Sequence, residues 1–194
     1  MADSNKIKYG LSKCYYAKAT IATDGSATYG TPVPLPGAVS IGMDQQSDRT
    51  PFWADNIQYY VSDSNQGYEG DLELAKLPDS FLTDILGYLV DENDILLEDA
   101  GANPEHFALM FQFQGDAHAR RYVLYNCVAS RPSLESSTKE DTITPQTESI
   151  SITATSIYNT SLNKDLVKAR VTETETTAYA SWYSTVYQAT TLHT

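Results

Sequence analysis

The strict alternation of apolar and polar or small side chains over residues 107–113 most constrains the fold of this chain. Phe107, Leu109, Phe111 and Phe113 alternate there with Ala108, Met110, Gln112 and Gln114. A period of two places successive side chains on opposite faces, which is typical of a β-strand with one buried face. The same period recurs at 149–154, where Ile150, Ile152 and Ala154 alternate with hydroxyl residues. The sequence therefore predicts a β-rich fold.

The remaining segments extend this pattern into one domain. We expect strands at 14–23, 26–29, 38–45, 68–77, 95–97, 107–113, 120–130, 133–142, 146–158 and 166–172. Asp24-Gly25 predicts a hairpin turn, as does Gly115-Asp116, and the prolines of 31–37 predict an extended connector. The aromatic end, with Tyr179, Trp182, Tyr183 and Tyr187, is compatible with a short helix or a strand.

One helix is predicted after Pro78, with Asp79 or Ser80 as its N-cap. Its apolar stripe is Leu82, Ile85, Leu86 and Leu89, at the spacing of a helix that packs on a sheet, and it should end near 91–94. The predicted fold class is therefore mainly β, a β-sandwich or barrel flanked by one α-helix.

Residues 49–70 are the least regular part and form either a long loop or an excursion of two ribbon-like strands. They contain Phe52, Trp53, Tyr59 and Tyr60 between turn-forming residues such as Asp55-Asn56 and 62–67. Large aromatic side chains on a loop are favoured anchors of protein interfaces. The alternative is that they fold back onto the core of their own domain.

The acidic residues are concentrated in the central third of the chain. The net charge is −12, and residues 44–105 hold fifteen acids against two bases, Arg49 and Lys76. DNA-binding proteins draw most of their affinity from Lys and Arg, so this distribution argues against DNA binding. Glu69, Asp71 and Glu73 share one face of the predicted strand at 68–77. They form either a plain solvated face, a carboxylate pair of a glycosidase, or a surface that faces a polyanion without binding it.

Catalytic motifs are missing from the sequence. It contains no HExxH, GxSxG, P-loop or GxGxxG pattern, and Cys14 and Cys127 are too far apart for a CxxC site. We expect both cysteines to be reduced and packed, and a dyad of Cys127 with His118 is a poor alternative. The expectation is therefore no enzyme, no cofactor and no metal. No transmembrane helix is expected, because no stretch of the sequence reaches the ~18 apolar residues that it needs. A signal peptide is not expected either, because Met1–Asn5 has no apolar run.

Five segments together resemble a known family. They are Pro-Gly-Ala-Val-Ser-Ile at 36–41, Phe-Trp-Ala-Asp-Asn at 52–56, Gly-Tyr-Glu-Gly-Asp-Leu-Glu at 67–73 leading into Leu77-Pro78, Arg-Tyr-Val-Leu-Tyr-Asn at 121–126, and the late Trp182. In this order, over roughly residues 6–188, they resemble the major tail proteins (tail tube proteins) of long-tailed bacteriophages.

The resemblance implies a single tail-tube domain over 1–194, with an N-terminal arm, a long loop at about 47–67 and a C-terminal extension at about 173–194. Its fold would be similar to that of the type VI secretion tube protein. The protein would be a structural part of the virion tail, assembled in the host cytoplasm. Its copies would form hexameric rings that stack into a tube, with tape-measure and tail-tip or terminator proteins as partners.

Genomic DNA would pass through the tube without specific binding, and no membrane is involved. On this interpretation Glu69, Asp71 and Glu73 are candidates for the lumen, and Phe52, Trp53, Tyr59 and Tyr60 for contacts between subunits. The alternative is a monomeric β-sandwich module that binds a carbohydrate or a host surface through its Tyr and Trp side chains.

Overall fold

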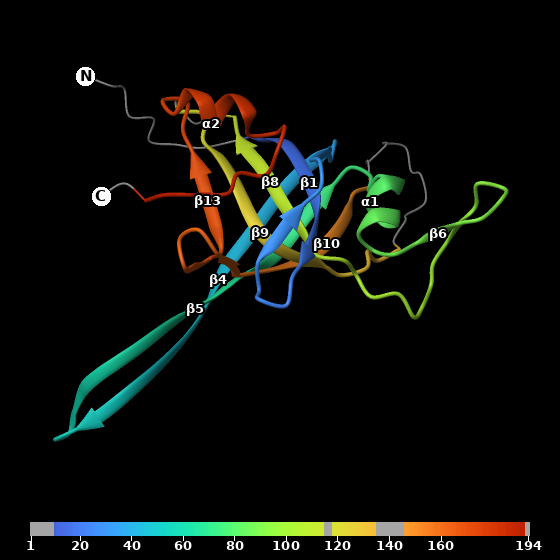
Figure 1. Cartoon of the computed structure of the whole chain (residues 1–194). Coiled ribbons are helices and arrows are strands. Elements are labelled where there is room, and N and C mark those ends of the chain that lie inside the picture. The colour runs from blue at the N-terminus through green and yellow to red at the C-terminus, as the bar shows by residue number, and fades with distance from the viewer. Residues whose placement is uncertain (1–9, 115–117, 135–145, 193–194) are drawn as a thin grey trace, which may run out of the picture.

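The computed structural model describes residues 10–114, 118–134 and 146–192, and only the backbone of Arg49, Thr50, Phe52, Ala54, Val61, Ser62, Asp63 and Thr176. Within this part of the chain, one strongly curled sheet carries most of the fold (Figure 1). Its strands are β1 (Leu11–Ile21), β2 (Ala27–Tyr29), β3 (Val33–Pro34), β4 (Ala38–Ala54), β5 (Ile57–Leu74), β8 (Phe107–Phe113), β9 (Arg121–Ala129), β10 (Glu148–Thr155) and β13 (Lys168–Val171). The predicted mainly β fold is confirmed.

The sheet curls because strand β9 divides one of its edges between two partners. Along its other edge β9 pairs with β8 from Arg121 to Cys127. On the divided edge, the first half of β9 pairs with β13 and the second half with β10. The order β2-β1-β8-β9-β10-β5-β4 therefore folds over on itself, so that β10, β5 and β4 cover one face of β1, β8 and β9.

Strand β8 is buried on both faces, which corrects the prediction of a half-buried strand. Phe107 and Leu109 belong to the core between the two layers, whereas Ala108 and Met110 belong to a second core on the opposite face. That second face is covered by the C-terminal segment, whose Trp182 is almost completely buried. The alternation of 107–113 does separate two faces of the strand. However, Ala108 and Met110 on the second face pack against another apolar layer instead of facing water.

The C-terminal aromatic segment forms a short helix, α2 (Thr176–Ser181), which lies against the end of β8 and β9 in Figure 1. Of the two possibilities left open from the sequence, the helix is therefore the one adopted. Two small ladders complete the structure, β6 (Leu89–Val90) with β7 (Leu96–Leu97), and β11 (Ile157–Asn159) with β12 (Lys164–Leu166).

Helix α1 (Asp79–Asp84) is shorter than predicted and begins one residue earlier, with Pro78 as the N-cap. Gly87 ends it in a left-handed conformation (φ +74°), and the Tyr88 amide donates back to the Leu82 carbonyl. Ile85 and Leu86 are buried as expected. Leu89 is not on the helix but in the exposed strand β6, because the glycine stops the helical period before it.

Strands β4 and β5 continue far beyond the body as a two-stranded ribbon (Figure 1). Of the two possibilities left open for residues 49–70, the ribbon of two strands is therefore the one adopted, and the long loop expected at about 47–67 is the outer part of this ribbon. The turn at its tip is Asp55-Asn56, with both residues at positive φ (+50° and +59°), which is typical of a tight hairpin. Residues 62–67, predicted as a turn, instead lie within β5.

Smaller differences follow from local geometry. The Asp24-Gly25 turn joins β1 to β2 as predicted. The proline connector contributes the two-residue edge strand β3. Val39, predicted to share a face with Ile41 and Met43, is exposed because a register shift between Ala38 and Ser40 takes it out of the ladder. The predicted turn at Gly115-Asp116 and most of the predicted strand at 133–142 lie outside the described residues.

Candidate functional site

The outward face of β10, β5 and β4 brings together the three carboxylates singled out in the sequence. In β5, Leu72 and Leu74 point into the core, while Glu69, Asp71 and Glu73 point away from it. Cross-strand neighbours on this face are Ser149, Ser151 and Thr153 from β10 and Ser40, Gly42 and Asp44 from β4. We call these nine residues the acidic face. None of them is basic, so the surface is anionic and rich in hydroxyl groups.

Hydroxyl groups hold two of the three carboxylates in place. Ser40 Oγ and Thr147 Oγ1 donate to the two carboxylate oxygens of Glu73, at 2.8 and 2.6 Å. Ser151 Oγ donates to Asp71 Oδ1 at 2.6 Å. The bonds from Thr147 and then Ser40 lower the pKa of Glu73 below its ordinary value, since they favour the charged form. The Glu73 carboxylate therefore stays ionised at neutral pH.

The acidic face places two like charges next to each other. Asp44 lies directly opposite Glu69 in the β4–β5 ladder. Like charges directly opposite each other in an antiparallel pair are destabilising. Among the described residues, no group of three or more His, Cys, Asp or Glu side chains is arranged to hold a metal ion. What the arrangement can do is repel phosphate groups.

The β4–β5 ribbon presents the aromatic residues singled out in the sequence. Trp53, Tyr59 and Tyr60 are 63–71% exposed, and Ile57 beside them is 59% exposed. These side chains do not fold back onto the core of their own molecule, which was the alternative. Phe52 lies in β4, but its side chain is not among those described. The ribbon tip is therefore an exposed apolar surface on an extended support.

The ribbon also leaves backbone hydrogen-bonding groups without a partner strand. In the described part of the chain, β4 pairs only with β5, and β5 pairs with β10 only from Tyr68 to Leu74. Both edges of the outer ribbon are therefore open. Open edges invite pairing with another chain, and an isolated two-stranded hairpin is only marginally stable in water.

A second apolar projection was missed in the sequence. The β6–β7 hairpin exposes Leu89, Val90, Ile95 and Leu97 on the far side of the body. Asp91 shapes its turn by accepting hydrogen bonds from the Ile95 and then the Asn93 amide, which lower the pKa of Asp91. The signal available was Gly87, a C-terminal stop for the helix, followed by the turn-forming Asp91–Asp94.

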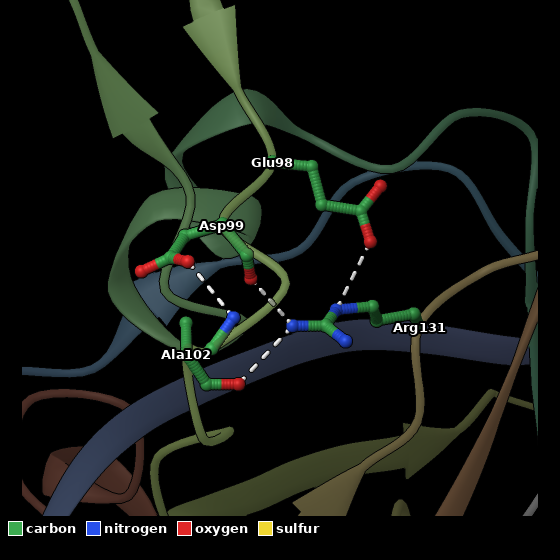
Figure 2. A network of polar contacts seen from close by, with 5 residues as sticks. Glu98, Asp99, Ala102 and Arg131 are labelled. Carbon is green, nitrogen blue, oxygen red and sulfur yellow. Dashed lines mark hydrogen bonds and ion pairs between the residues drawn. The ribbon is translucent and has the colours of Figure 1, made fainter.

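Arg131 fastens the loop that follows this projection to the body (Figure 2). Its Nε lies 3.1 Å from Glu98 Oε1, and its Nη2 donates to the carbonyls of Asp99 and Ala102, at 2.8 and 3.1 Å. The Asp99 carboxylate in turn accepts from the Gly101 amide. Each of these Arg131 contacts is to the loop itself, so the role of the network is to hold the loop in place.

The cysteines offer no reactive thiol. Cys14 and Cys127 are both free and buried. Burial raises the pKa of each thiol to about 12, so neither forms a thiolate at neutral pH. This argues against the Cys127–His118 dyad. No helix in the described residues is long and apolar enough to span a membrane.

Comparisons with known proteins give one family match and a distant structural likeness. A family model described as "Phage tail tube protein" matches residues 2–194. Among curated proteins there is no match. One similar solved structure is the anti-feeding prophage cap, a tube-terminating cap, at 14% identity and a TM-score of 0.43. The match covers 89% of this chain and 97% of that one.

Proposed function

Because this chain belongs to the phage tail tube protein family, and so is a structural component of a phage tail, we propose that its copies assemble into stacked hexameric rings. The rings form a tube through which DNA is delivered to the host. Assembly takes place in the host cytoplasm. Tape-measure and tail-tip or terminator proteins are the partners that set the length and the ends of the tube.

The observation that carries this proposal is the open, projecting ribbon. Strand β4 ends the strand order of the sheet, and its outer part and that of β5 leave the body with both edges unpaired in the described structure. Trp53, Tyr59 and Tyr60 are exposed at its tip. A fold with such edges is completed by contacts between copies, and head-to-tail contacts that close make a ring.

The acidic face is the surface that we assign to the lumen. DNA that slides through a tube must not bind its wall, and binding to DNA arises chiefly when Lys and Arg neutralise phosphates. The acidic face holds Glu69, Asp71, Glu73 and Asp44, no base, and a set of hydroxyl groups. The sheet that carries the acidic face has a free edge at β4. Joining of the sheets of neighbouring copies at this edge would continue the acidic face around the ring.

Negative-stain electron microscopy together with analytical ultracentrifugation of the purified chain tests the proposal. We expect rings or tubes whose population rises with protein concentration. A variant with Trp53, Tyr59 and Tyr60 replaced by serine should remain folded and monomeric, because it loses the apolar surface at the ribbon tip. A matched control replaces Leu89, Val90 and Leu97 of the β6–β7 projection by serine, and it should still form rings.

The exposed aromatic residues also fit the alternative function, a monomeric module that binds carbohydrate. Trp53, Tyr59 and Tyr60 would then form a stacking platform for sugar rings. The same experiment separates the two functions. A monomer of 21.4 kDa at every concentration, retained on a glycan array by these three side chains, would overturn the tube proposal.

A further inference from the structure

An apolar groove opens between the two layers of the sheet, at the root of the ribbon. Its volume is about 510 Å³, within the range of about 300–1,000 Å³ in which proteins bury small organic groups. One wall consists of Ile41, Met43 and Tyr68 from β4 and β5. The inner core ends here, so that these three side chains are only partly buried.

The opposite wall is aromatic. Phe111 of β8 stacks on Tyr122 of β9 with 5.5 Å between ring centroids. Phe113 meets both rings edge to face, at 5.6 Å in each case. Phe113 and Tyr122 are half-buried in the single chain. Such a wall offers ring faces and edges to a further aromatic side chain, which stacks on aromatic neighbours or meets them edge to face.

Two cations lie on the rim of the groove. Lys168 and Arg170 of β13 are exposed and stand beside Leu124 and Tyr122 in the ladder with β9. The Lys168 ammonium lies 4.4 Å from the centroid of the Tyr68 ring. In a chain with a net charge of −12 and thirteen bases in all, two cations at an apolar groove define a surface that attracts an acidic, aromatic partner.

The tip of the β4–β5 ribbon has the matching chemistry. It combines exposed Trp53, Tyr59 and Tyr60 with the exposed Asp55 carboxylate in its turn. The tip cannot enter the groove of its own molecule, because Met43 in the groove wall and Ala54 at the tip lie on one extended strand. At about 3.3 Å per residue, roughly 35 Å separate them. The tip that fills a groove therefore belongs to another copy.

The other exposed apolar surface does not fit the tip. The β6–β7 projection carries Asp91, Glu92 and Asp94 around Leu89, Val90, Ile95 and Leu97. An acidic tip would be repelled there, because like charges brought together across an interface weaken the contact. Of the two apolar surfaces described outside the ribbon, only the groove combines aromatic rings with positive charge.

We propose that the groove lined by Met43, Phe113 and Tyr122 receives the ribbon tip of a second copy of this chain, with Lys168 and Arg170 facing the tip's Asp55. The inference rests on the proposed function and names the receiving surface of its assembly contact. Tip and groove are different surfaces of one molecule, so the contact is head to tail and propagates from copy to copy.

Disulfide trapping between two singly substituted proteins tests this contact. One protein carries Tyr60→Cys in the tip, and the other carries Met43→Cys in the groove. One of the two proteins carries a tag that makes it larger, so that after mixing, assembly and oxidation the heterodimer runs between the two homodimers on a non-reducing gel and reports contact between tip and groove of different copies. Cys14 and Cys127 are buried and free, so they do not compete. We expect at least tenfold more heterodimer than with Leu97→Cys, the control on the β6–β7 projection. Ile41→Cys is the second groove position, used if Met43→Cys fails to fold.

The outcomes separate the inference from the proposed function. Heterodimer at Met43→Cys or Ile41→Cys, in samples that form rings or tubes, supports both. Rings or tubes with no heterodimer at either groove position, or with an excess at Leu97→Cys, overturn the groove contact and leave the tube proposal intact. Proteins that remain monomeric at every concentration overturn both.

Discussion

At the level of single residues, Gly70 shows how closely β5 and β4 approach. A Cβ atom at Gly70 would lie 1.8 Å from the Gly42 carbonyl oxygen, a backbone atom that cannot move aside cheaply. At Gly42, one strand away, an added Cβ meets nothing within 4 Å. The close backbone approach therefore requires a glycine at position 70 but not at position 42, and the sequence alone does not show this difference.

We expect Gly70→Ala to lower the free energy of unfolding by more than about 1 kcal/mol, because the ladder at the root of the ribbon must shift. Gly42→Ala, the matched control, should change it by less than half as much. Urea denaturation of dilute protein measures both values. Equal effects at the two positions would show that the close approach at Gly70 is not a property of the protein.

The ionisation of Glu73 makes the stability of the fold depend on pH. Hydrogen bonds from Thr147 and Ser40 lower its pKa below the ordinary value of 4.5. A carboxyl group with a lowered folded-state pKa stabilises the fold above its unfolded pKa, and this contribution disappears as the pH falls through the lowered value. The contribution of Glu73 is therefore full above about pH 5 and is lost on acidification below 4.5.

Replacing Thr147 by valine should weaken this pH dependence, because the carboxylate loses its first donor. The free energy of unfolding of Thr147→Val should fall less than that of the wild type between pH 5 and pH 3. Asp24, Asp91 and Glu175 shift in the same direction, so only the difference between the two proteins reports on Glu73. Thr153→Val, on the same face, should retain the wild-type profile; an identical profile for Thr147→Val would contradict the assignment.

At the level of elements, the C-terminal segment is part of the core. Trp182 is 2% exposed and covers the second face of the central strands, next to Met110 and Tyr125. The Arg121 guanidinium lies 3.5 Å from the Tyr179 ring centroid and ties α2 to the start of β9. The segment expected as a C-terminal extension thus has a packing role within its own domain.

Truncating the side chain in Trp182→Ala should destabilise the fold by about 3–5 kcal/mol, the usual effect of removing a large buried aromatic group. Leu192→Ala, at an exposed position in the same terminal segment, should change stability by less than about 0.5 kcal/mol. Thermal or urea unfolding measures both. A small effect at Trp182 would mean that the second face is covered in another way.

Strands β10 and β8 show which properties of a strand its alternating pattern predicts and which it does not. Strand β10 has the predicted alternation, with Ile150 and Ile152 buried and Ser149 and Ser151 exposed, because its outer face meets water. Strand β8 has the same period, yet both of its faces are buried. The alternation shows only that two groups of side chains point to opposite faces. Whether each face is covered depends on segments far away in the chain.

At the scale of the whole molecule, the proposed position of the acidic face in the lumen predicts how a reversal of its charge affects DNA delivery. Replacing Glu69, Asp71 and Glu73 together by lysine should leave assembly possible and slow or block DNA delivery, because lysines on a face that lines the lumen, as we propose, would bind phosphates. The control replaces Glu92, Asp165 and Glu173 by lysine, which changes the net charge equally at exposed positions elsewhere. Phage particles carrying each variant are compared for DNA ejection. Normal ejection by the first variant, in normal virions, would place the three residues outside the lumen.

The candidate surfaces differ in how far the sequence could predict them. Glu69, Asp71 and Glu73 could be assigned to one face, since alternation within a strand is local, but the serines and threonines beside them come from two other strands. The exposed aromatic tip could be suspected from 52–60. The groove beside Lys168 and Arg170 could not, because its walls come from four separate strands and β13.

Local rules account for what the chain alone specifies: the alternating strands, the Asp24-Gly25 and Asp55-Asn56 turns, the start of α1 near Pro78 and the inward-facing leucines of β5. These depend on neighbours within a few residues. The pairing of β10 with β5, the division of β9 between β13 and β10, and the exposure or burial of each face depend on segments far apart in the chain, such as Ala17 and Trp182 of one buried cluster. Only the folded chain decides them, because burial is a property of what packs on a residue and not of the residue itself.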